Sequence, residues 1–310
     1  MPGLEDSTTP LRNSRIGDII STQLSSTAAF LSAEYLADIA VAALHDEADL
    51  TPKPGLVDGR GSGAHRDMTR EMLHASADAL RPAFEYCVAA ARNFDNDVEL
   101  RAELGRIGRA GEAAMLRATG GVNTHRGSLW ALGLLCVGAA NAVNAASTAR
   151  IAMRAAKLAR IPDPAASIAD DATSHGAEVR RLYHVRGAVG EARAGFPHVT
   201  LLALPTLLQA RELEFAEQNA RLHVLLTLMA RLDDTCILHR GGMTGLIAVQ
   251  NSAQSVLNAG GAETVFGRKQ FNILDRLCAD EELSPGGSGD LLAATLFLAA
   301  VQEEVAQCRH

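Results

Sequence analysis

The chain has 310 residues, of which 47% are apolar and only 4% aromatic, and its net charge at pH 7 is −7. This negative charge argues against a general nucleic-acid-binding protein, because such proteins usually present a basic field to the phosphate backbone. Abundant Ala and scarce aromatic residues indicate a core of closely packed helices.

The N-terminal residues 1–24 form a polar stretch without an early apolar run, and we expect a flexible tail rather than a signal peptide. The five cysteines lie far apart and include no CxxC pair, which disfavours a disulfide framework or a zinc site and fits reduced thiols. The most apolar long stretch, 129–143, is too short to span a bilayer. These features predict a soluble, cytoplasmic protein that binds neither membrane nor nucleic acid.

Helical periodicity begins near Ser25 and continues to Asp46, where Thr51-Pro-Lys-Pro-Gly55 prevents its continuation. A glycine-rich loop, 59–63, precedes a second helical pattern over 65–93. Further helices are expected at 99–118, 127–145, 147–160, 176–184, 197–213, 215–231, 243–258, 262–281 and 289–307. Period-2 runs of β-branched residues are almost absent. We therefore predict an all-α fold, with residues 25–310 forming one compact multi-helix domain whose polar, Gly-rich loops form the active site.

The first segment that concentrates polar residues, 51–68, surrounds the glycine loop. It contains Lys53, Asp58, His65, Arg66 and Asp67. Glycines let backbone N–H groups approach phosphate oxygens, and the following helix start offers a positive dipole end. A glycine loop before a helix is also an ordinary turn, so this segment alone does not establish a binding site.

The second segment, 120–127, leads into an apolar helix. Asn123 or Thr124 would serve as a helix cap, whereas His125 and Arg126 add hydrogen-bond donors where an anion is already favoured. A third segment, 186–197, places Glu191 between glycines. It is either a surface turn or a close approach of the backbone to a bulky ligand.

The fourth segment, 233–242, begins with adjacent carboxylates and ends with His239, Arg240 and two glycines. Asp233 and Asp234 repel each other unless they are solvated, cap a helix, or are neutralised by Arg or a metal ion. A fifth segment, 283–290, contains Ser284, Ser288 and Asp290, which would cap the last helix or belong to the same site.

Several well-known signatures are missing. The sequence has no P-loop, no HExxH zinc motif and no G-x-S-x-G nucleophile elbow. ATP use in the P-loop manner, zinc hydrolysis and acyl transfer are therefore all disfavoured.

The five segments together resemble the triphosphoribosyl-dephospho-CoA synthase family. The successive stretches TPKPGLVD with GAHRDM, GVNTHRG, GEARAGFP, LMARLDDTCILHRGG and LSPGGSGDLLAATL look like the motifs of that family in order. Arg126 stands where the family usually has Lys, and the short glycine loop 59–63 replaces a usual acidic or Asn-rich stretch.

The resemblance implies a transferase that joins the 5-triphosphoribosyl group of ATP to the ribose 2′-hydroxyl of 3′-dephospho-CoA and releases adenine. The product would pass through a separate transferase to the acyl carrier protein of malonate decarboxylase or citrate lyase, with malonate decarboxylase favoured. ATP and 3′-dephospho-CoA would be the substrates. Mg²⁺ is expected with ATP, and no tightly bound organic cofactor is expected.

Cleavage of an N-glycosidic bond develops positive charge on the sugar, which a carboxylate stabilises, while a second carboxylate accepts the proton of the attacking hydroxyl. We assign Asp234 or Glu191 as base, Asp67 as the stabiliser of the oxocarbenium-like transition state, and Asp233 and Asp290 as Mg²⁺ contacts. The remaining motif residues are assigned to substrate binding: Lys53, His65, Arg66, Asn123, His125, Arg126, His239, Arg240, Ser284 and Ser288.

Two alternatives stay open on the residues alone. An ADP-ribosyl- or nucleoside-hydrolase-like helical N-glycosidase would use water as nucleophile, and would release free ribose triphosphate without dephospho-CoA. A non-catalytic, nucleotide-responsive module that binds an acyl carrier protein would release no adenine.

Overall fold

The computed structural model describes residues 31–141, 147–165 and 175–307, and within these ranges the chain is helical without a β-strand. The helices are α2 (Ala33–Asp49), α3 (Arg70–Asn93), α4 (Asp97–Ala118), α5 (Arg126–Ala139), α6 (Thr148–Ala159), α8 (His175–Tyr183), α9 (Gly187–Arg193), the π-helix η2 (His198–Ala203), α10 (Leu204–Glu212), α11 (Glu217–Met229), α12 (Thr235–Asn258), α13 (Val265–Asp280) and α14 (Gly286–Gln307). The all-α prediction is confirmed, whereas the predicted tail, 1–24, lies outside the described residues.

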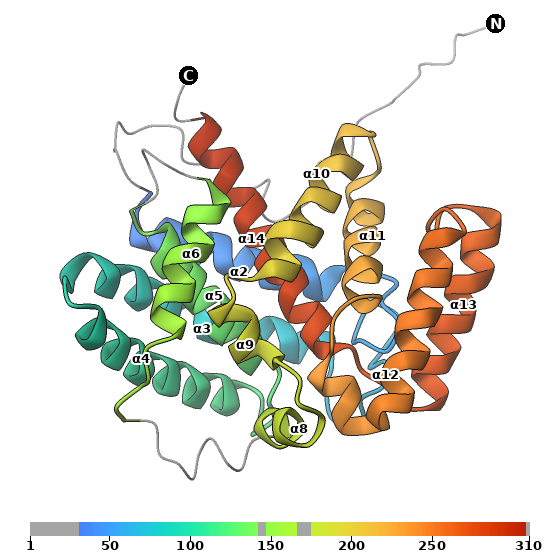
Figure 1. Cartoon of the computed structure of the whole chain (residues 1–310), viewed down its shortest axis with the longest axis horizontal. Coiled ribbons are helices and arrows are strands. Elements are labelled where there is room, and N and C mark those ends of the chain that lie inside the picture. The colour runs from blue at the N-terminus through green and yellow to red at the C-terminus, as the bar shows by residue number, and fades with distance from the viewer. Residues whose placement is uncertain (1–30, 142–146, 166–174, 308–310) are drawn as a thin grey trace, which may run out of the picture.

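The last helix, α14, runs through the centre of the molecule (Figure 1). Every residue from Leu291 to Val301 is buried, because α14 packs against α2, α5, α10, α11, α12 and η2. A helix that is apolar on all sides must be covered on all sides. In the described part of the chain, no helix combines the length and the apolar character needed to cross a membrane.

The other helices surround α14 in antiparallel or crossing pairs. α3 packs between α2 and α4 on one side, and α12 and α13 form a hairpin at the opposite edge (Figure 1). The loop that joins α2 to α3, residues 50–69, contains a cis peptide bond between Thr51 and Pro52 and lies close to α13. At the N-terminus of α14, Gly286 lies against Cys236 of α12, and Gly289 lies against Glu47 of α2.

Several predicted helix boundaries differ from those in the structure, and the short helix α9 was not expected. The predicted helix 243–258 forms the second part of α12, and a first part that begins at Thr235 precedes it across a kink at Gly242. Gly242 has non-helical backbone angles (φ 60°, ψ −161°), and a Cβ on Gly241 would lie 2.5 Å from a methyl carbon of Leu283. Residues 187–193 form the short helix α9, and the predicted helix 197–213 divides into η2 and α10.

Candidate active site

Asp234 connects the N-termini of two helices. As the N-cap of α12 it accepts the Cys236 N–H through Oδ1 at 2.9 Å, and the same oxygen accepts the Gly287 N–H of α14 at 3.3 Å. Its Oδ2 accepts the Ser288 N–H at 2.8 Å and the Ser288 hydroxyl at 3.0 Å. The residue is 1% exposed, and burial raises the pKa of its carboxyl group. Asp234 thus crosslinks α12 to α14, with donors at both carboxyl oxygens.

Asp290, in the first turns of α14, makes a similar connection to α5. Its Oδ1 accepts the Ser128 hydroxyl, and the Ser128 backbone also donates to this carboxyl group. A Cβ on Gly127 would lie 2.0 Å from Oδ2, so the close approach requires glycine. Burial, together with the carboxylates of Glu47 and Asp234, raises the pKa of Asp290 to about 7. This carboxyl group therefore changes its charge near neutral pH.

The N-termini of α5, α12 and α14 converge through these two carboxyl groups. A helix N-terminus carries unpaired N–H groups and a partial positive charge, and it stabilises a nearby anion. Here the anions are supplied by the protein itself, from Asp234 and Asp290. Three of the segments with concentrated polar residues, 120–127, 233–242 and 283–290, thereby meet in space.

Lys53 is 1% exposed and is held at both ends. Its Nζ donates to the backbone oxygen of Glu47 at 2.6 Å and to Glu47 Oε1 at 2.8 Å, whereas its backbone N–H donates to Asp58 Oδ2 at 2.7 Å. Glu47 lies against the start of α14, since a Cβ on Gly289 would come within 3.1 Å of its Oε1. The first segment thus reaches the same buried cluster as the other three, through Lys53.

Glu47 is a site residue that the sequence patterns do not reveal. The helical pattern was expected to end at Asp46, but α2 continues to Asp49 and Glu47 falls on the buried side of its last turn. His45, Asp46 and Glu47 are all less than 10% exposed. One signal in the sequence could have revealed Glu47. The polar run 45–47 continues the apolar face of the helix and ends six residues before Lys53, which is buried.

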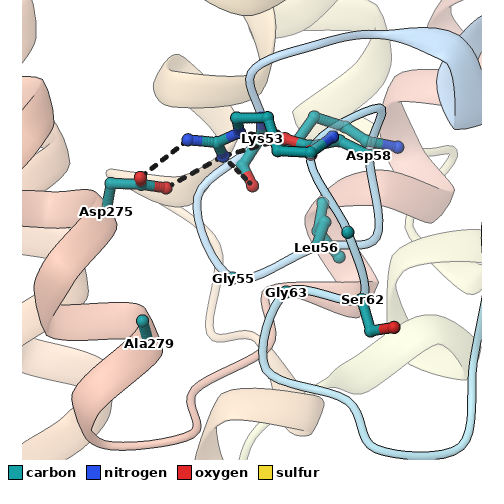
Figure 2. Close-up of a pocket in the computed structure, with 10 residues that line it drawn as sticks. Lys53, Gly55, Leu56, Asp58, Ser62, Gly63, Asp275 and Ala279 are labelled. Carbon is teal, nitrogen blue, oxygen red and sulfur yellow. Dashed lines mark hydrogen bonds and ion pairs between the residues drawn. The ribbon is translucent and has the colours of Figure 1, made fainter.

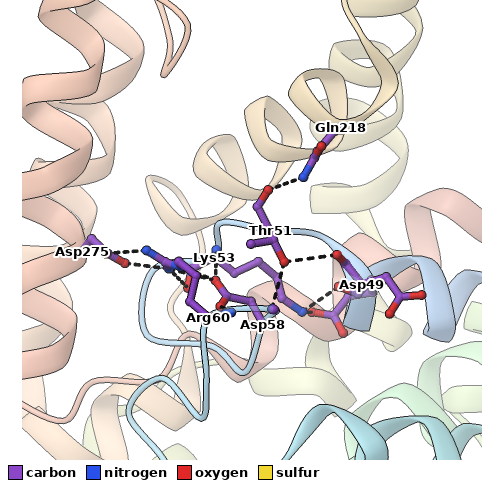
Figure 3. Close-up of polar contacts among 9 residues, drawn as sticks. Asp49, Thr51, Lys53, Asp58, Arg60, Gln218 and Asp275 are labelled. Atoms are coloured by element: carbon purple, nitrogen blue, oxygen red, sulfur yellow. Dashed lines mark hydrogen bonds and ion pairs between the residues drawn. The ribbon is translucent and has the colours of Figure 1, made fainter. Parts of the chain in front are cut away.

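Arg60 ties the glycine loop to α13. Its guanidinium pairs with Asp275 at 2.7 Å and 3.0 Å, and its Nε donates to Asp58 Oδ2 at 2.9 Å (Figure 3). The Gln218 side chain of α11 donates to the backbone oxygen of Thr51, which fixes the start of the loop. The short loop 59–63 therefore contacts α13 through Arg60 and Asp275, a contact that the sequence did not indicate.

His65 links the end of this loop to the fourth and fifth segments. Its Nε2 lies 2.8 Å from Ser284 Oγ, and its Nδ1 lies 3.2 Å from Arg240 Nη2. Arg240 also donates to the backbone oxygen of Ala64 at 2.9 Å. Burial and the charge of Arg240 lower the pKa of His65, which is therefore mainly neutral at pH 7.

His125, the N-cap residue of α5, is buried in a polar chain. The Thr124 hydroxyl donates to Ser76 Oγ at 2.6 Å, and Ser76 Oγ lies 2.8 Å from His125 Nδ1. Burial and the nearby charge of Lys53 lower the pKa of His125 to about 3. With Ser76 donating to Nδ1, the neutral ring carries its proton on Nε2, which is buried and has no hydrogen-bond partner among the described residues.

Glu191 belongs to a neighbouring group. Its Oε1 accepts the His198 N–H at 2.8 Å, and its Oε2 lies 2.8 Å from His198 Nδ1. This bond to Glu191, with further contributions from the Arg231 backbone and Asp233, raises the pKa of His198. A Cβ on Gly187 would lie 3.2 Å from a methyl group of Thr235, so the start of α9 touches the start of α12. The third segment therefore borders the fourth.

Other predicted site residues lie at the surface. Asp67 is exposed, with its Oδ1 3.9 Å from His65 Nδ1. Arg66 pairs with Glu282, and Arg126 pairs with Glu112. Asn123 Oδ1 accepts the Arg126 N–H at 3.2 Å, as expected for a residue that caps the start of α5.

His239 is also exposed, and its ring stacks on that of His175 at a centroid distance of 4.0 Å. The structure thus brings Lys53, His65, Asp234, Arg240, Ser284, Ser288 and Asp290 into one hydrogen-bonded or contiguous region. The chemical roles assigned to the individual residues stay predictions.

The two predicted metal contacts have different surroundings. Asp233 is exposed, and its charge contributes to the raised pKa of His198. Asp290 is mostly buried beside Glu47 and Asp234. Within the described ranges, no three or more His, Cys, Asp or Glu side chains are grouped so that they alone would hold a metal ion. A cation here would require further ligands from a substrate or from water.

Comparison with known proteins covers most of the chain. Residues 33–309 match the CitG family, described as ATP:dephospho-CoA triphosphoribosyl transferase. A protein from Pseudomonas aeruginosa (strain UCBPP-PA14) is 53% identical to this chain over 266 residues, and one from Azotobacter vinelandii is 51% identical over 267 residues. These matches cover 86% of this chain and 90% and 91% of the relatives, both named as probable 2-(5''-triphosphoribosyl)-3'-dephosphocoenzyme-A synthases. No solved structure matches the chain.

Proposed function

Because the chain belongs to the CitG family of ATP:dephospho-CoA triphosphoribosyl transferases, it is a triphosphoribosyl-dephospho-CoA synthase, and we propose that its reaction takes place where α5, α12 and α14 begin. One observation carries this placement. Residues from all five polar segments, far apart in the sequence, meet around the N-terminus of α14 through Asp234, Asp290, Lys53 and His65, with Glu191 at the border.

The reaction has two requirements that carboxylates meet. The 2′-hydroxyl of 3′-dephospho-CoA attacks C1′ of ATP, adenine leaves, and the triphosphate stays on the transferred sugar. A base must accept the hydroxyl proton, and a negative group must stabilise the developing positive charge on the ribose. Asp234 or Glu191 is proposed as the base, and Asp67 as the stabilising group.

The hydrogen bonds that Asp234 and Glu191 already make allow another carboxylate to be the base. Both oxygens of Asp234 already accept hydrogen bonds, and Glu191 is bound to His198, so either base would have to give up a partner. Asp290, whose pKa is about 7, accepts hydrogen bonds from Ser128 alone among the described residues and is a third candidate, in which case Asp233 would contact Mg²⁺ in its place. Substitutions that separate stability from turnover distinguish the three residues.

The triphosphate is proposed to bind three exposed arginines, Arg66, Arg126 and Arg240. The backbone N–H groups at the starts of α12 and α14 already donate to Asp234, so side chains must supply most of the donors. Charge-assisted bonds from guanidinium groups to phosphate are among the strongest that a protein makes. Ser284 and Ser288 are proposed as further substrate contacts.

Mg²⁺ is proposed to accompany ATP. The donor chemistry fits, because Mg²⁺ usually binds one or two carboxylates together with substrate phosphates and water, and does not need a cage of protein side chains. Asp290 would hold it, and the neighbouring Glu47 carboxylate adds to the negative potential there. Asp233, which is exposed, is proposed as the second contact. When bound, the ion neutralises charge on the triphosphate.

The fate of the product is also part of the proposal. It would pass through a separate transferase to an acyl carrier protein, with malonate decarboxylase favoured over citrate lyase. We place the reaction in the cytoplasm, which supplies ATP and dephospho-CoA and keeps thiols reduced, as fits the free Cys87, Cys136, Cys236 and Cys278.

The test is incubation of the protein with ATP, Mg²⁺ and 3′-dephospho-CoA, followed by mass spectrometry. We expect adenine and the coupled product in equal amounts, and little reaction with coenzyme A, whose 3′-phosphate lies beside the attacking hydroxyl. Free ribose triphosphate without an acceptor would indicate an N-glycosidase instead. Binding of nucleotide without release of adenine would indicate a non-catalytic module.

A further inference from the structure

A pocket of about 250 Å³ lies between the loop that joins α2 to α3 and the helix α13. Its loop wall contains Leu56 and the glycines at 55, 61 and 63, and its helix wall contains Asp275 and Ala279 (Figure 2). Gly55 and Gly63 have φ angles of +71° and +58°, and a Cβ on either would clash with a backbone oxygen. The loop wall therefore has no side chain at Gly55, Gly61 and Gly63, between the side chains of Leu56, Arg60 and Ser62.

The charges that line this pocket neutralise one another. Arg60 is paired with Asp275 and with Asp58, and the ammonium group of Lys53 is bound to Glu47. None of the lining residues is aromatic. Arg60 is shared by two carboxylates and the Lys53 ammonium group is buried against Glu47, so this pocket attracts a phosphate group less than the exposed arginines with a single ion-pair partner do. It also has no ring on which a purine would stack.

The remaining chemistry suits an uncharged chain that has amide groups and short apolar links. The Ser62 hydroxyl offers a hydrogen bond, the Gly55 and Gly61 carbonyl oxygens each accept one bond within the loop and keep a second lone pair, and Leu56 and Ala279 offer apolar contacts. Of the chemical groups in the two substrates, the triphosphate, the diphosphate and the adenine rings do not fit this description. The pantetheine arm of dephospho-CoA, with two amides between methylene groups, does.

The pocket is connected to the proposed reaction site by Lys53. The backbone of Lys53 is fixed by Asp58 in the pocket wall, and its ammonium group reaches Glu47 beside the start of α14. A substrate whose ribose lies at the α14 N-terminus could thus extend its arm along the same loop. We propose that this pocket holds the pantetheine arm of 3′-dephospho-CoA, an inference that rests on the proposed function.

The test fills the pocket from its helix wall. Ala279 is exposed, so that Ala279→Phe should leave the fold intact while occupying the space between α13 and the loop. We expect the KM for dephospho-CoA to rise about tenfold or more, with the KM for ATP within about twofold of the wild-type value. Ser62→Trp fills the pocket from the loop wall and should do the same. Ala110→Phe, at an exposed position of α4, is the matched control and should change neither KM.

ADP serves as an acceptor that lacks the arm but retains the ribose and diphosphate. The wild-type protein should use ADP with a much higher KM than dephospho-CoA, and Ala279→Phe should not raise that KM further. An unchanged KM for dephospho-CoA in both filled variants would overturn the inference, as would an equal rise for ADP and dephospho-CoA. Failure of the proposed function itself is distinguishable, because the wild-type protein would then release no adenine with dephospho-CoA.

Discussion

Replacing Asp234 by Asn tests whether the crosslink between α12 and α14 is as strong as its geometry indicates. The carboxylate accepts two hydrogen bonds at each oxygen, and an amide has only one oxygen. If the Asn NH₂ group replaces Oδ1 it faces two N–H donors, whereas in place of Oδ2 it faces only the Ser288 N–H, because the Ser288 hydroxyl can rotate and accept from it. In this better orientation one lost bond of about 1 kcal/mol and one unsatisfied buried donor give a loss of about 1–3 kcal/mol, after part is offset by removing a buried charge.

Thermal unfolding measures this loss. For a chain of this length, a change of that size should lower the melting temperature by roughly 2–5 °C. Asp233→Asn is the matched control, because Asp233 is exposed and adjacent, and it should alter stability by about 0.5 kcal/mol or less. A melting temperature for Asp234→Asn no lower than that of Asp233→Asn would refute the crosslink.

Turnover measured well below the melting temperature then separates architecture from chemistry. If Asp234 accepts the hydroxyl proton, its Asn variant should lose about 10²-fold or more in turnover while ATP still binds. If Asp233 contacts Mg²⁺, its variant should need more metal for half-maximal activity and should recover partly as Mg²⁺ is raised. Normal turnover in a folded Asp234→Asn variant would transfer the base role to Glu191 or Asp290.

Three further outcomes are expected. Gly127→Ala should lower turnover about tenfold or more and destabilise the fold by about 1–3 kcal/mol, because the added methyl group collides with the Asp290 carboxyl group; turnover and thermal melting measure both effects. Arg126→Ala should weaken ATP binding about tenfold to a hundredfold with unchanged circular dichroism, because the exposed Arg126 side chain pairs with Glu112. A variant that melts early would show instead that Arg126 has a structural role. If Asp290 must be ionised, its raised pKa predicts that kcat/KM, which reports on the free enzyme, rises with pH around a midpoint of about 7, and Asp290→Asn should remove that limb of the pH profile.

The helical architecture was predictable because the local signals agree. Abundant Ala, long apolar periodicities and short polar breaks favour helices in every part of the described chain. The start of α12 was not predictable in the same way, because Gly241-Gly242 resembles a helix end. Gly241 is instead required by its close contact with Leu283, a residue 42 positions later, and such contacts leave no local signal.

The candidate site was predictable only in part, for a related reason. Asp234, Ser288 and Asp290 lie in recognisable polar segments, and they do meet. Glu47 and Asp275 lie in ordinary helices with no motif around them, and their importance depends on partners that only the folded chain supplies. Asp275 pairs with Arg60 across 215 positions of sequence, a distance at which periodicity carries no information.

The two buried carboxylates of α12 and α14 also explain why the sequence motifs alone do not separate catalysis from architecture. Asp234 joins two helix N-termini and Asp290 joins α14 to a third, so that substitution of either disturbs the relative placement of α5, α12 and α14. At the same time, burial raises the pKa of both groups, which is the condition that proton transfer near neutral pH requires. The helix N-termini offset part of the cost of ionising these groups, because their partial positive charge stabilises the carboxylate form. Stability and reactivity at this site therefore depend on the same hydrogen bonds, and turnover reports on the chemistry only when it is measured well below the melting temperature of each variant.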